Sequence, residues 1–174
     1  MPELHIRRLE PHDAAAYRAI RLAALKGEPE NYGSTFEEES VMAILPFETH
    51  ISERSSVQVM YGAFSGEELI GITAYFREVR MKLRHRGKVT QVYIAPEYRG
   101  RGLAKQLVKA VVEDAFAQDG LEILTLEVVA GNIAAVRTYE SLGFVQYGLM
   151  ERYFKTDNGY TDQRYMVLKS GNIG

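Results

Sequence analysis

A short glycine-rich segment carries the clearest chemical signal in this chain. The apolar stretch Val92–Ile94 precedes the loop Arg99-Gly100-Arg101-Gly102, and Leu103 then begins a helical pattern. Backbone N–H groups at the start of a helix have no intrahelical acceptor, and the positive end of the helix dipole lies behind them. Such a turn binds anions, and Lys105 together with the two arginines of the loop adds positive charge there. The pattern therefore indicates a site for a diphosphate, as part of a phosphate-bearing cofactor.

The segments around this loop predict a mixed α/β fold. Apolar stretches predict strands over about Leu4–Leu9, Val57–Phe64, Leu69–Phe76, Lys88–Ile94, Leu121–Val129, Phe144–Phe154 and Asp162–Lys169. Helical spacing predicts helices between Asp13 and Gly27, from Phe36 to Arg54 with a kink or break at Pro46, from Leu103 to Phe116, and from Asn132 to Ser141. This order is typical of the α/β class, with a central mixed sheet of about seven strands flanked by about four helices. Since no repeat or linker divides the chain, we expect a single domain over residues 1–174.

Two of the strands carry finer expectations. Alternation in the first strand turns Leu4 and Ile6 toward the core, and Leu9 could join them. The segment Leu121–Val129 is apolar on both sides apart from three polar residues, and this pattern predicts a central strand buried on both faces.

Composition narrows the class of protein. The chain has 174 residues, of which 46% are hydrophobic and 25% charged, and this fits one globular domain. A formal net charge of -2 provides no overall attraction to nucleic acids or anionic membranes. The absence of cysteine excludes disulfides, thiolate metal sites and an acyl-cysteine intermediate. Because the first residues lack a signal-peptide pattern and no apolar run is long enough to span a bilayer, we expect a soluble cytoplasmic protein.

Two sequence blocks together resemble the GNAT (Gcn5-related) N-acetyltransferase family. The first is Arg99-Gly100-Arg101-Gly102-Leu103-Ala104, and the second, about thirty residues later, is Asn132-Ile133-Ala134-Ala135-Val136-Arg137-Thr138-Tyr139-Glu140-Ser141-Leu142-Gly143-Phe144. A lone Gly-x-Gly is weak evidence, whereas two blocks in this order and within a matching order of elements are strong. The resemblance implies a GNAT-like domain that uses acetyl-CoA as the acetyl donor.

The resemblance also implies a set of cofactor-binding residues. The end of the strand at Val92–Ile94 would pair its backbone with the pantetheine arm, and the following loop would bind the diphosphate. The family pattern has Gln or Arg three residues before the first glycine, whereas this chain has Glu97, so no role is assigned to that side chain. The implied cofactor-binding residues are Val92, Tyr93, Ile94, Arg99, Gly100, Arg101, Gly102, Leu103, Ala104, Lys105, Asn132 and Tyr139.

Tyr139 and Asn132 have further implied roles. Tyr139 matches the family tyrosine near the cofactor sulfur, where a phenol can give a proton to the departing thiolate. The alternative for Tyr139 is a core tyrosine on a buried helix face. Asn132 would bond the pantetheine arm or cap its helix, and both roles are compatible because Asn is a good N-cap.

The group that takes the proton of the acceptor amine is left open. Glu127 lies five residues before Asn132, where a glutamate is the proton acceptor in ribosomal-protein N-terminal acetyltransferases of this family. A carboxylate in so apolar a strand needs a hydrogen bond or a raised pKa. Glu127 could instead bind a neighbouring backbone and hold the strands apart. His85 and a chain of water molecules are the other candidates. His5, His12 and His50 have no companions at metal-ligand spacing, so we expect no metal site.

Two charged clusters and one further segment are of interest for the acceptor. Glu37–Glu39 opens a helix where the family's acceptor pocket often lies, although acids at a helix start also suit its dipole. A basic hairpin is predicted, whose even-numbered members would share one strand face; its members are Arg77, Arg80, Lys82, Arg84, Arg86 and Lys88. The segment Leu25–Glu39 resembles one found in a subset of uncharacterised bacterial family members.

We therefore expect an N-acetyltransferase that moves an acetyl group from acetyl-CoA to a primary amine by direct attack in a ternary complex. Backbone N–H at the end of the strand, that of Ile94, would stabilise the negative charge on oxygen. A small-molecule amine or an amino acid ranks first as acceptor, and a protein amino terminus or lysine ranks second. The alternative from another class is a non-catalytic module that senses acyl-CoA. We expect neither nucleic acid nor membrane as partner, and dimers are common among relatives, which leaves a homodimer open.

Overall fold

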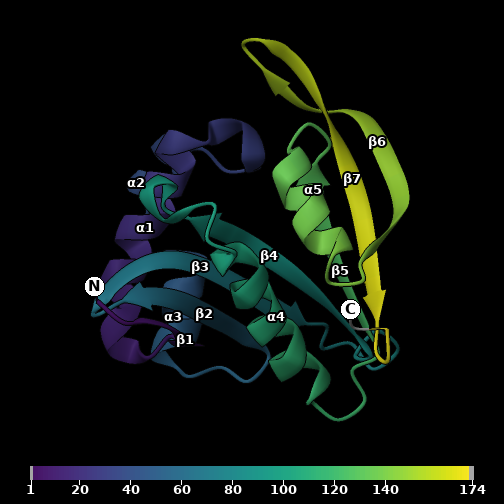
Figure 1. Cartoon of the computed structure of the whole chain (residues 1–174), viewed down its shortest axis with the longest axis horizontal. Helices are drawn as coiled ribbons and strands as arrows, with labels where there is room; N and C mark the ends of the chain where they lie inside the picture. The colour runs from purple at the N-terminus through teal and green to yellow at the C-terminus, as the bar shows by residue number, and fades with distance from the viewer. Residues whose placement is uncertain (1, 173–174) are drawn as a thin grey trace.

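The computed structural model describes residues 2–172, which form a seven-stranded sheet with helices on both faces (Figure 1). The strands are β1 (Leu4–Arg8), β2 (Gln58–Ser65), β3 (Glu68–Arg77), β4 (Arg86–Ile94), β5 (Ile123–Val129), β6 (Val145–Thr156) and β7 (Gly159–Lys169). The helices are α1 (Ala14–Gly27), α2 (Phe36–Ser40), α3 (Pro46–Ser52), α4 (Leu103–Phe116) and α5 (Ile133–Glu140). Across the sheet the order is β1-β2-β3-β4-β5-β7-β6. The α/β class and the mixed seven-stranded sheet predicted from the sequence are confirmed.

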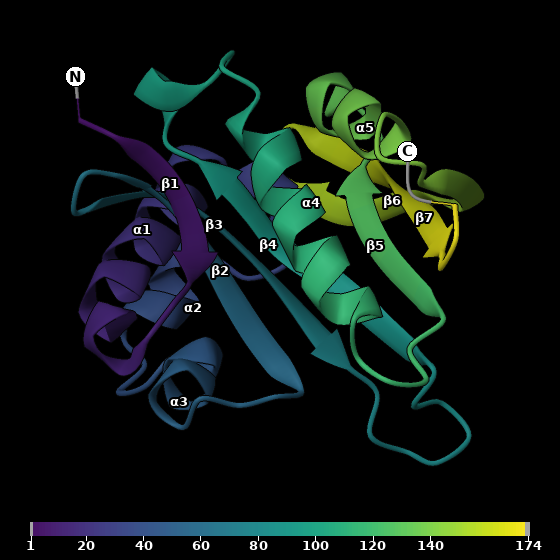
Figure 2. The same ribbon diagram turned by 60° about the horizontal axis from the view of Figure 1, so that its bottom comes forward.

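The pairing of β4 with β5 is parallel, whereas the other neighbouring strands are antiparallel. β4 and β5 pair only near their starts, from Arg86 opposite Ile123 to Lys88 opposite Thr125. Beyond this point β4 contains a bulge at Gln91, which has a φ of 55°. Since a bulge bends its strand, β4 and β5 separate toward their C-terminal ends, as Figure 2 shows.

Two layers of helices bury the two faces of the sheet. On β2, Met60 and Phe64 face the cluster formed with α1 and α3, while Val59 and Ala63 face α4. This alternation follows from the two-residue period of a strand. In Figure 2, α4 crosses the near face of the sheet and α1 lies behind it. α4 therefore lies beside the space that opens between β4 and β5.

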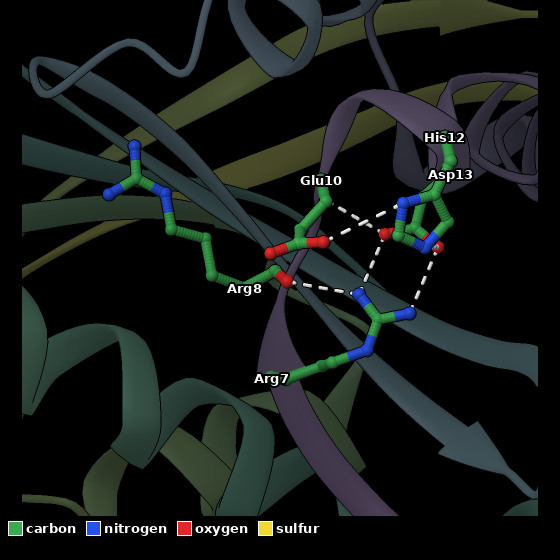
Figure 3. A network of polar contacts seen from close by, with 5 residues as sticks. All are labelled: Arg7, Arg8, Glu10, His12 and Asp13. Carbon is green, nitrogen blue, oxygen red and sulfur yellow. Dashed lines mark hydrogen bonds and ion pairs between the residues drawn. The ribbon is translucent and has the colours of Figure 1, made fainter.

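A network of polar contacts fixes the start of α1 against β1 (Figure 3). The guanidinium of Arg7 donates to both carboxylate oxygens of Asp13, at 2.7 and 3.0 Å, and to the carbonyl of Arg8 at 3.1 Å. The Glu10 amide donates to Asp13 at 2.7 Å, and the ring of His12 lies 3.6 Å from Glu10. Burial acts to raise the pKa of Asp13, but these hydrogen bonds outweigh it and hold the pKa below its ordinary value.

The helix predicted from Phe36 to Arg54, with a kink or break at Pro46, is divided into two short helices in the structure. α2 ends at Ser40, and Pro46 is the first residue of α3. Proline is tolerated at the first position of a helix, where its missing N–H would have no acceptor, but it disrupts a helix interior. Thr35 begins α2 with a capping box, since its hydroxyl accepts from the Glu38 amide and Glu38 accepts from the Thr35 amide.

Three other expectations are corrected. Leu4 is exposed rather than turned inward, whereas Leu9 is buried. β5 is buried on one face only, because its even-numbered residues face the core and Ile123, Thr125 and Glu127 are partly exposed. The predicted basic hairpin is a loop between β3 and β4, so the basic residues between 78 and 85 share no strand face. Arg77, at the end of β3, donates to backbone carbonyls of Arg84 and Asp119.

Candidate active site

A cavity of about 850 Å³ lies where β4 and β5 separate. Its lining comes from β4, β5, the start of α4, α5 and the β6–β7 hairpin, and from the N-terminal segment that contains α1, α2 and the start of α3. Elements distant in the sequence therefore meet around one space. All of the predicted cofactor-binding residues except Arg101 line this cavity, and so does Glu127.

The glycine loop exposes its backbone to the cavity. Gly100 and Gly102 have φ values of 75° and 73°, a left-handed conformation that other residues adopt only at a cost. A Cβ atom at Gly100 would meet no protein atom within 4 Å, so the space beside it is open. The first bond within α4 joins the Gln106 amide to the Gly102 carbonyl, at 3.2 Å. The amides of Leu103–Lys105 precede it and have no intrahelical acceptor, which fits a diphosphate at this point.

The two arginines of the loop lie differently. Arg99 donates to the Ile94 carbonyl at 2.9 Å and forms an ion pair with Glu28 at 2.5 Å. Arg101 donates to the Glu97 carbonyl at 3.4 Å and lies over the Tyr98 ring, outside the cavity lining. The free backbone amides, rather than the side chain of Arg101, therefore offer the donors that face the cavity.

α5 brings Tyr139 into the same space. Asn132 caps the helix, because its side-chain oxygen accepts from the Ala135 amide at 3.2 Å. Tyr139 is 6% exposed and lines the cavity, with its ring edge-on to Phe144 at 6.1 Å. Burial raises the pKa of the Tyr139 hydroxyl well above its ordinary value. The hydroxyl therefore keeps its proton at neutral pH and is available as a hydrogen-bond donor.

Glu127 forms an ion pair with Lys88 across the point where β4 and β5 separate. The distance from Lys88 Nζ to Glu127 Oε1 is 2.6 Å, and both side chains are about one third exposed. Lys88 is also the last residue of β4 that pairs with β5. Among the described residues, Glu127 therefore pairs with the side chain of Lys88 and not with a neighbouring backbone group, which was the alternative considered for it. His85 lies just before β4, outside the cavity lining, where its carbonyl accepts from the amides of Glu122 and Ile123.

The segment between α1 and α2 contributes residues that the sequence analysis did not single out. The Tyr32 hydroxyl donates to the Val92 carbonyl at 3.3 Å, and the guanidinium of Arg21 lies 5.1 Å from the Tyr32 ring. Arg21 in turn makes two hydrogen bonds to Glu39, at 2.9 and 2.6 Å. Burial raises the pKa of Tyr32 above its ordinary value. The resemblance of Leu25–Glu39 to a family segment is the only sequence signal for Tyr32, and Glu39 also belongs to the predicted acidic cluster Glu37–Glu39.

The β6–β7 hairpin closes the opposite side of the cavity with Tyr153, Phe154 and Gln163. A Cβ atom on Gly33 would lie 3.5 Å from the Phe154 ring, so the hairpin contacts the segment between α1 and α2. The position of these three hairpin residues at the cavity cannot be inferred from sequence periodicity. It depends on how the long hairpin lies against the N-terminal segment.

The described part of the chain offers neither a metal-binding cluster nor a membrane-spanning helix. Among residues 2–172, no group of three or more His, Asp or Glu side chains is placed to hold a metal ion. In the same residues no helix has the length and apolar character needed to cross a membrane.

Comparisons with known proteins identify similar sequences. The family model described as the acetyltransferase (GNAT) family matches residues 18–144. Over 105 residues the chain is 32% identical to N-alpha-acetyltransferase 30 of Schizosaccharomyces pombe, which covers 60% of this chain and 68% of that protein. Over 102 residues it is 30% identical to spermidine N(1)-acetyltransferase of Vibrio cholerae, covering 59% and 57%. Over 77 residues it is 35% identical to the ribosomal protein bS18 alanine N-acetyltransferase of Escherichia coli, covering 44% and 51%. The aligned segments thus span about half to two thirds of these curated relatives.

Solved structures resemble the whole chain. A GNAT-family acetyltransferase from Streptococcus pneumoniae superposes with a TM-score of 0.78 at 29% identity, covering 96% of this chain and 99% of that one. A protein of Salmonella typhimurium solved with its cofactor acetyl-CoA has a TM-score of 0.75 at 18% identity, covering 95% and 93%. The second likeness is one of fold alone.

Proposed function

Because this chain belongs to the acetyltransferase (GNAT) family and is therefore an acyltransferase, we propose that it moves an acetyl group from acetyl-CoA to a primary amine. The observation that carries the proposal is one cavity lined by the open amides of α4, the buried phenol of Tyr139 and the carboxylate of Glu127. When bound, acetyl-CoA supplies an activated thioester. The amine attacks directly in a ternary complex, since the chain has no cysteine to carry the acetyl group.

The residues of the cavity then have distinct tasks. The amides of the glycine loop and of the first turn of α4 bind the diphosphate. Backbone groups at the end of β4 align the pantetheine arm, and the Ile94 N–H stabilises the negative charge that develops on the acetyl oxygen. As the nitrogen–carbon bond forms and the carbon–sulfur bond breaks, Tyr139 gives its proton to the departing sulfur.

Glu127 is the proposed acceptor of the proton that the amine loses. Its ion pair with Lys88 engages Oε1, while a carboxylate has a second oxygen with two further lone pairs. Oε2 therefore remains available for the amine, and the Lys88 ammonium holds the carboxylate in place. A chain of water molecules from the cavity to bulk solvent is the other route for this proton.

The acceptor is proposed at the level of its reacting group. The three curated relatives are named for N(1) of spermidine, for the alanine of ribosomal protein bS18 and for an N-alpha group. N(1) of spermidine and the α-nitrogen of alanine are primary amines. At this level the proposal covers small-molecule amines, amino acids and protein amines alike.

The test is thiol release from acetyl-CoA over a panel of polyamines, amino acids, aminoglycosides and short peptides. We expect turnover with one class and a loss of about tenfold or more in Tyr139→Phe. Tyr147→Phe is the matched control, because Tyr147 is 58% exposed on β6 and lies outside the cavity lining. Equal rates in wild type and Tyr139→Phe would contradict the role of the phenol. Binding of acetyl-CoA without turnover on any amine would instead support a sensor module.

A further inference from the structure

We propose that Gln163 recognises an amide group of the acceptor, so that the preferred acceptor is an α-amino amide such as the amino terminus of a peptide. This inference rests on the proposed acetyl transfer and names the substrate class of the same cavity. Two independent observations lead to it, namely a buried side-chain oxygen without a partner on Gln163, a residue of the cavity wall, and the pairing of the charges around the cavity.

The first observation is the side chain of Gln163. It lies on β7 opposite Val129 of β5 and Met150 of β6, is 5% exposed and lines the cavity. Its side-chain oxygen is buried and has no hydrogen-bond partner among the described residues. Leaving such a group unpaired is costly, so a bound molecule that pairs with it is favoured.

A group that can both donate and accept hydrogen bonds is the natural partner of a glutamine amide. Rotation about the terminal torsion of Gln163 exchanges its oxygen and nitrogen, and this torsion has broad, two-fold preferences. The side chain can therefore present its oxygen to the cavity. Thr161, two residues earlier on the same face of β7, also has a buried hydroxyl oxygen without a partner among residues 2–172.

The second observation is that the carboxylates of the cavity are already paired. The lining contains three carboxylates, and each lies within 2.6 Å of a cation of this chain. These pairs are Glu39 with Arg21, Glu127 with Lys88, and Glu28 with Arg99. A polyamine would bring a second ammonium. Glu28 and Glu39 are paired, and Glu127 contacts Lys88 through Oε1 while Oε2 faces the reacting amine in the proposed mechanism. The second ammonium therefore finds no uncommitted carboxylate among the described lining residues, and its desolvation would be uncompensated.

The same ion pairs engage three of the four cationic side chains that line the cavity, namely Arg21, Lys88 and Arg99. The remaining lining cation, Lys105, lies in the first turn of α4, at the proposed diphosphate site. A free carboxylate on the acceptor would therefore lack a cation near Gln163. Tyr32, Tyr153 and Phe154 add aromatic surface to the lining, which suits an uncharged acceptor. A neutral amide next to the reacting amine satisfies all of these conditions.

The experiment compares acceptors that differ in one atom or one charge. Leucine N-methylamide and leucine methyl ester are similar in size and charge, but only the amide has the N–H. We expect wild-type kcat/KM to favour the amide by about tenfold or more, equivalent to about 1.4 kcal/mol. Leucine N-(2-aminoethyl)amide keeps the amide and adds a second ammonium, and we expect it to react more slowly than the N-methylamide.

Two variants assign the preference to Gln163. Gln163→Met keeps the length of the side chain and removes its amide, so the ratio of amide to ester should fall to about threefold or less. Gln146→Met is the matched control on β6, where Gln146 accepts from Arg164 and lies outside the cavity lining. It should keep the wild-type ratio. A merely structural role for Gln163 would lower both rates and leave the ratio unchanged.

Each outcome decides a separate point. Equal wild-type rates for amide and ester would overturn the inference without any variant, so a Gln163→Met protein that fails to fold does not block the test. A wild-type ratio that persists in Gln163→Met would overturn the role of Gln163. Faster reaction of the aminoethyl amide would overturn the charge argument. If none of the amines supports cleavage of acetyl-CoA, the proposed acetyl transfer fails, and this inference fails with it.

Discussion

Substitution of Arg21 by methionine tests how the segment between α1 and α2 is held at the cavity. Arg21 lies in α1 and makes two hydrogen bonds to Glu39 in α2, and their side chains are only 7% and 9% exposed. The guanidinium also lies over the ring of Tyr32, whose hydroxyl bonds to β4 at Val92. One ion pair therefore links two helices to the strand that is proposed to align the cofactor.

The size of the effect follows from the burial of the pair. Arg21→Met leaves the Glu39 carboxylate buried without its cation, and removal of one partner from a buried pair costs about 3–5 kcal/mol. For a domain of this size the melting temperature would fall by roughly 6–20 °C. Replacing both partners by methionine removes the isolated charge, so the double variant should recover most of the lost stability.

Urea unfolding of the wild type, both single variants and the double variant measures the coupling between the two residues. Arg18→Met is the matched control in the same helix, because its partner Glu48 forms a more exposed pair, and we expect a smaller loss. Equal losses in Arg18→Met and Arg21→Met, or additive losses in the double variant, would refute the argument. Because Tyr32 contacts Arg21, the KM for acetyl-CoA should also rise in Arg21→Met.

Three further predictions concern the site and the stability of the fold. Gly102→Ala forces alanine into a left-handed conformation that costs about 1–2 kcal/mol, so acetyl-CoA should bind about tenfold more weakly, as measured by calorimetry. Gly27→Ala is the control, because Gly27 has open space around it and no positive φ, and this variant should bind acetyl-CoA normally. Glu127→Gln should lower kcat/KM by about 100-fold in a thiol-release assay, and an unchanged rate would favour the water chain. Burial acts to raise the pKa of Glu39, but its hydrogen bonds to Arg21 outweigh this and lower the pKa. The contribution of the ionised Glu39 to folding stability is therefore complete above the ordinary carboxylate pKa and is lost as the pH falls below about 4. Urea unfolding between pH 7 and pH 3 should show this loss for the wild type and a shallower one for the Arg21→Met/Glu39→Met variant.

The parts of the fold that the sequence predicts well are those with regular local patterns. α4 has its predicted bounds, because Leu103, Leu107 and Val111 are buried at helical spacing and the glycine loop precedes them. The segment from Phe36 to Arg54 is predicted less well. The break at Pro46 follows from the proline, which is the first residue of α3, whereas the end of α2 at Ser40 has no comparable signal in the sequence.

The site divides in the same way. The face of β5 that carries Glu127 follows from the two-residue period of a strand. Its partner Lys88 is 39 residues away in the chain, and the two meet only because β4 and β5 pair in parallel at their starts. Tyr32 and Gln163 reach the cavity from segments without a motif. Their roles depend on tertiary contacts, which no local spacing encodes.

The three ion pairs of the cavity explain why recognition there should depend on uncharged groups. A charge in the wall of a partly buried cavity needs a partner, and each of the three lining carboxylates has one within this chain. The pairing stabilises the wall, and it leaves only Oε2 of Glu127, which is proposed to take the proton of the reacting amine. What remains for the acceptor is the amide of Gln163 and an aromatic surface, while the phenol of Tyr139 remains for the chemistry. Selectivity among amines would then come from hydrogen bonds that an incorrect acceptor leaves unmade, and such unpaired groups discriminate more strongly than apolar contacts do.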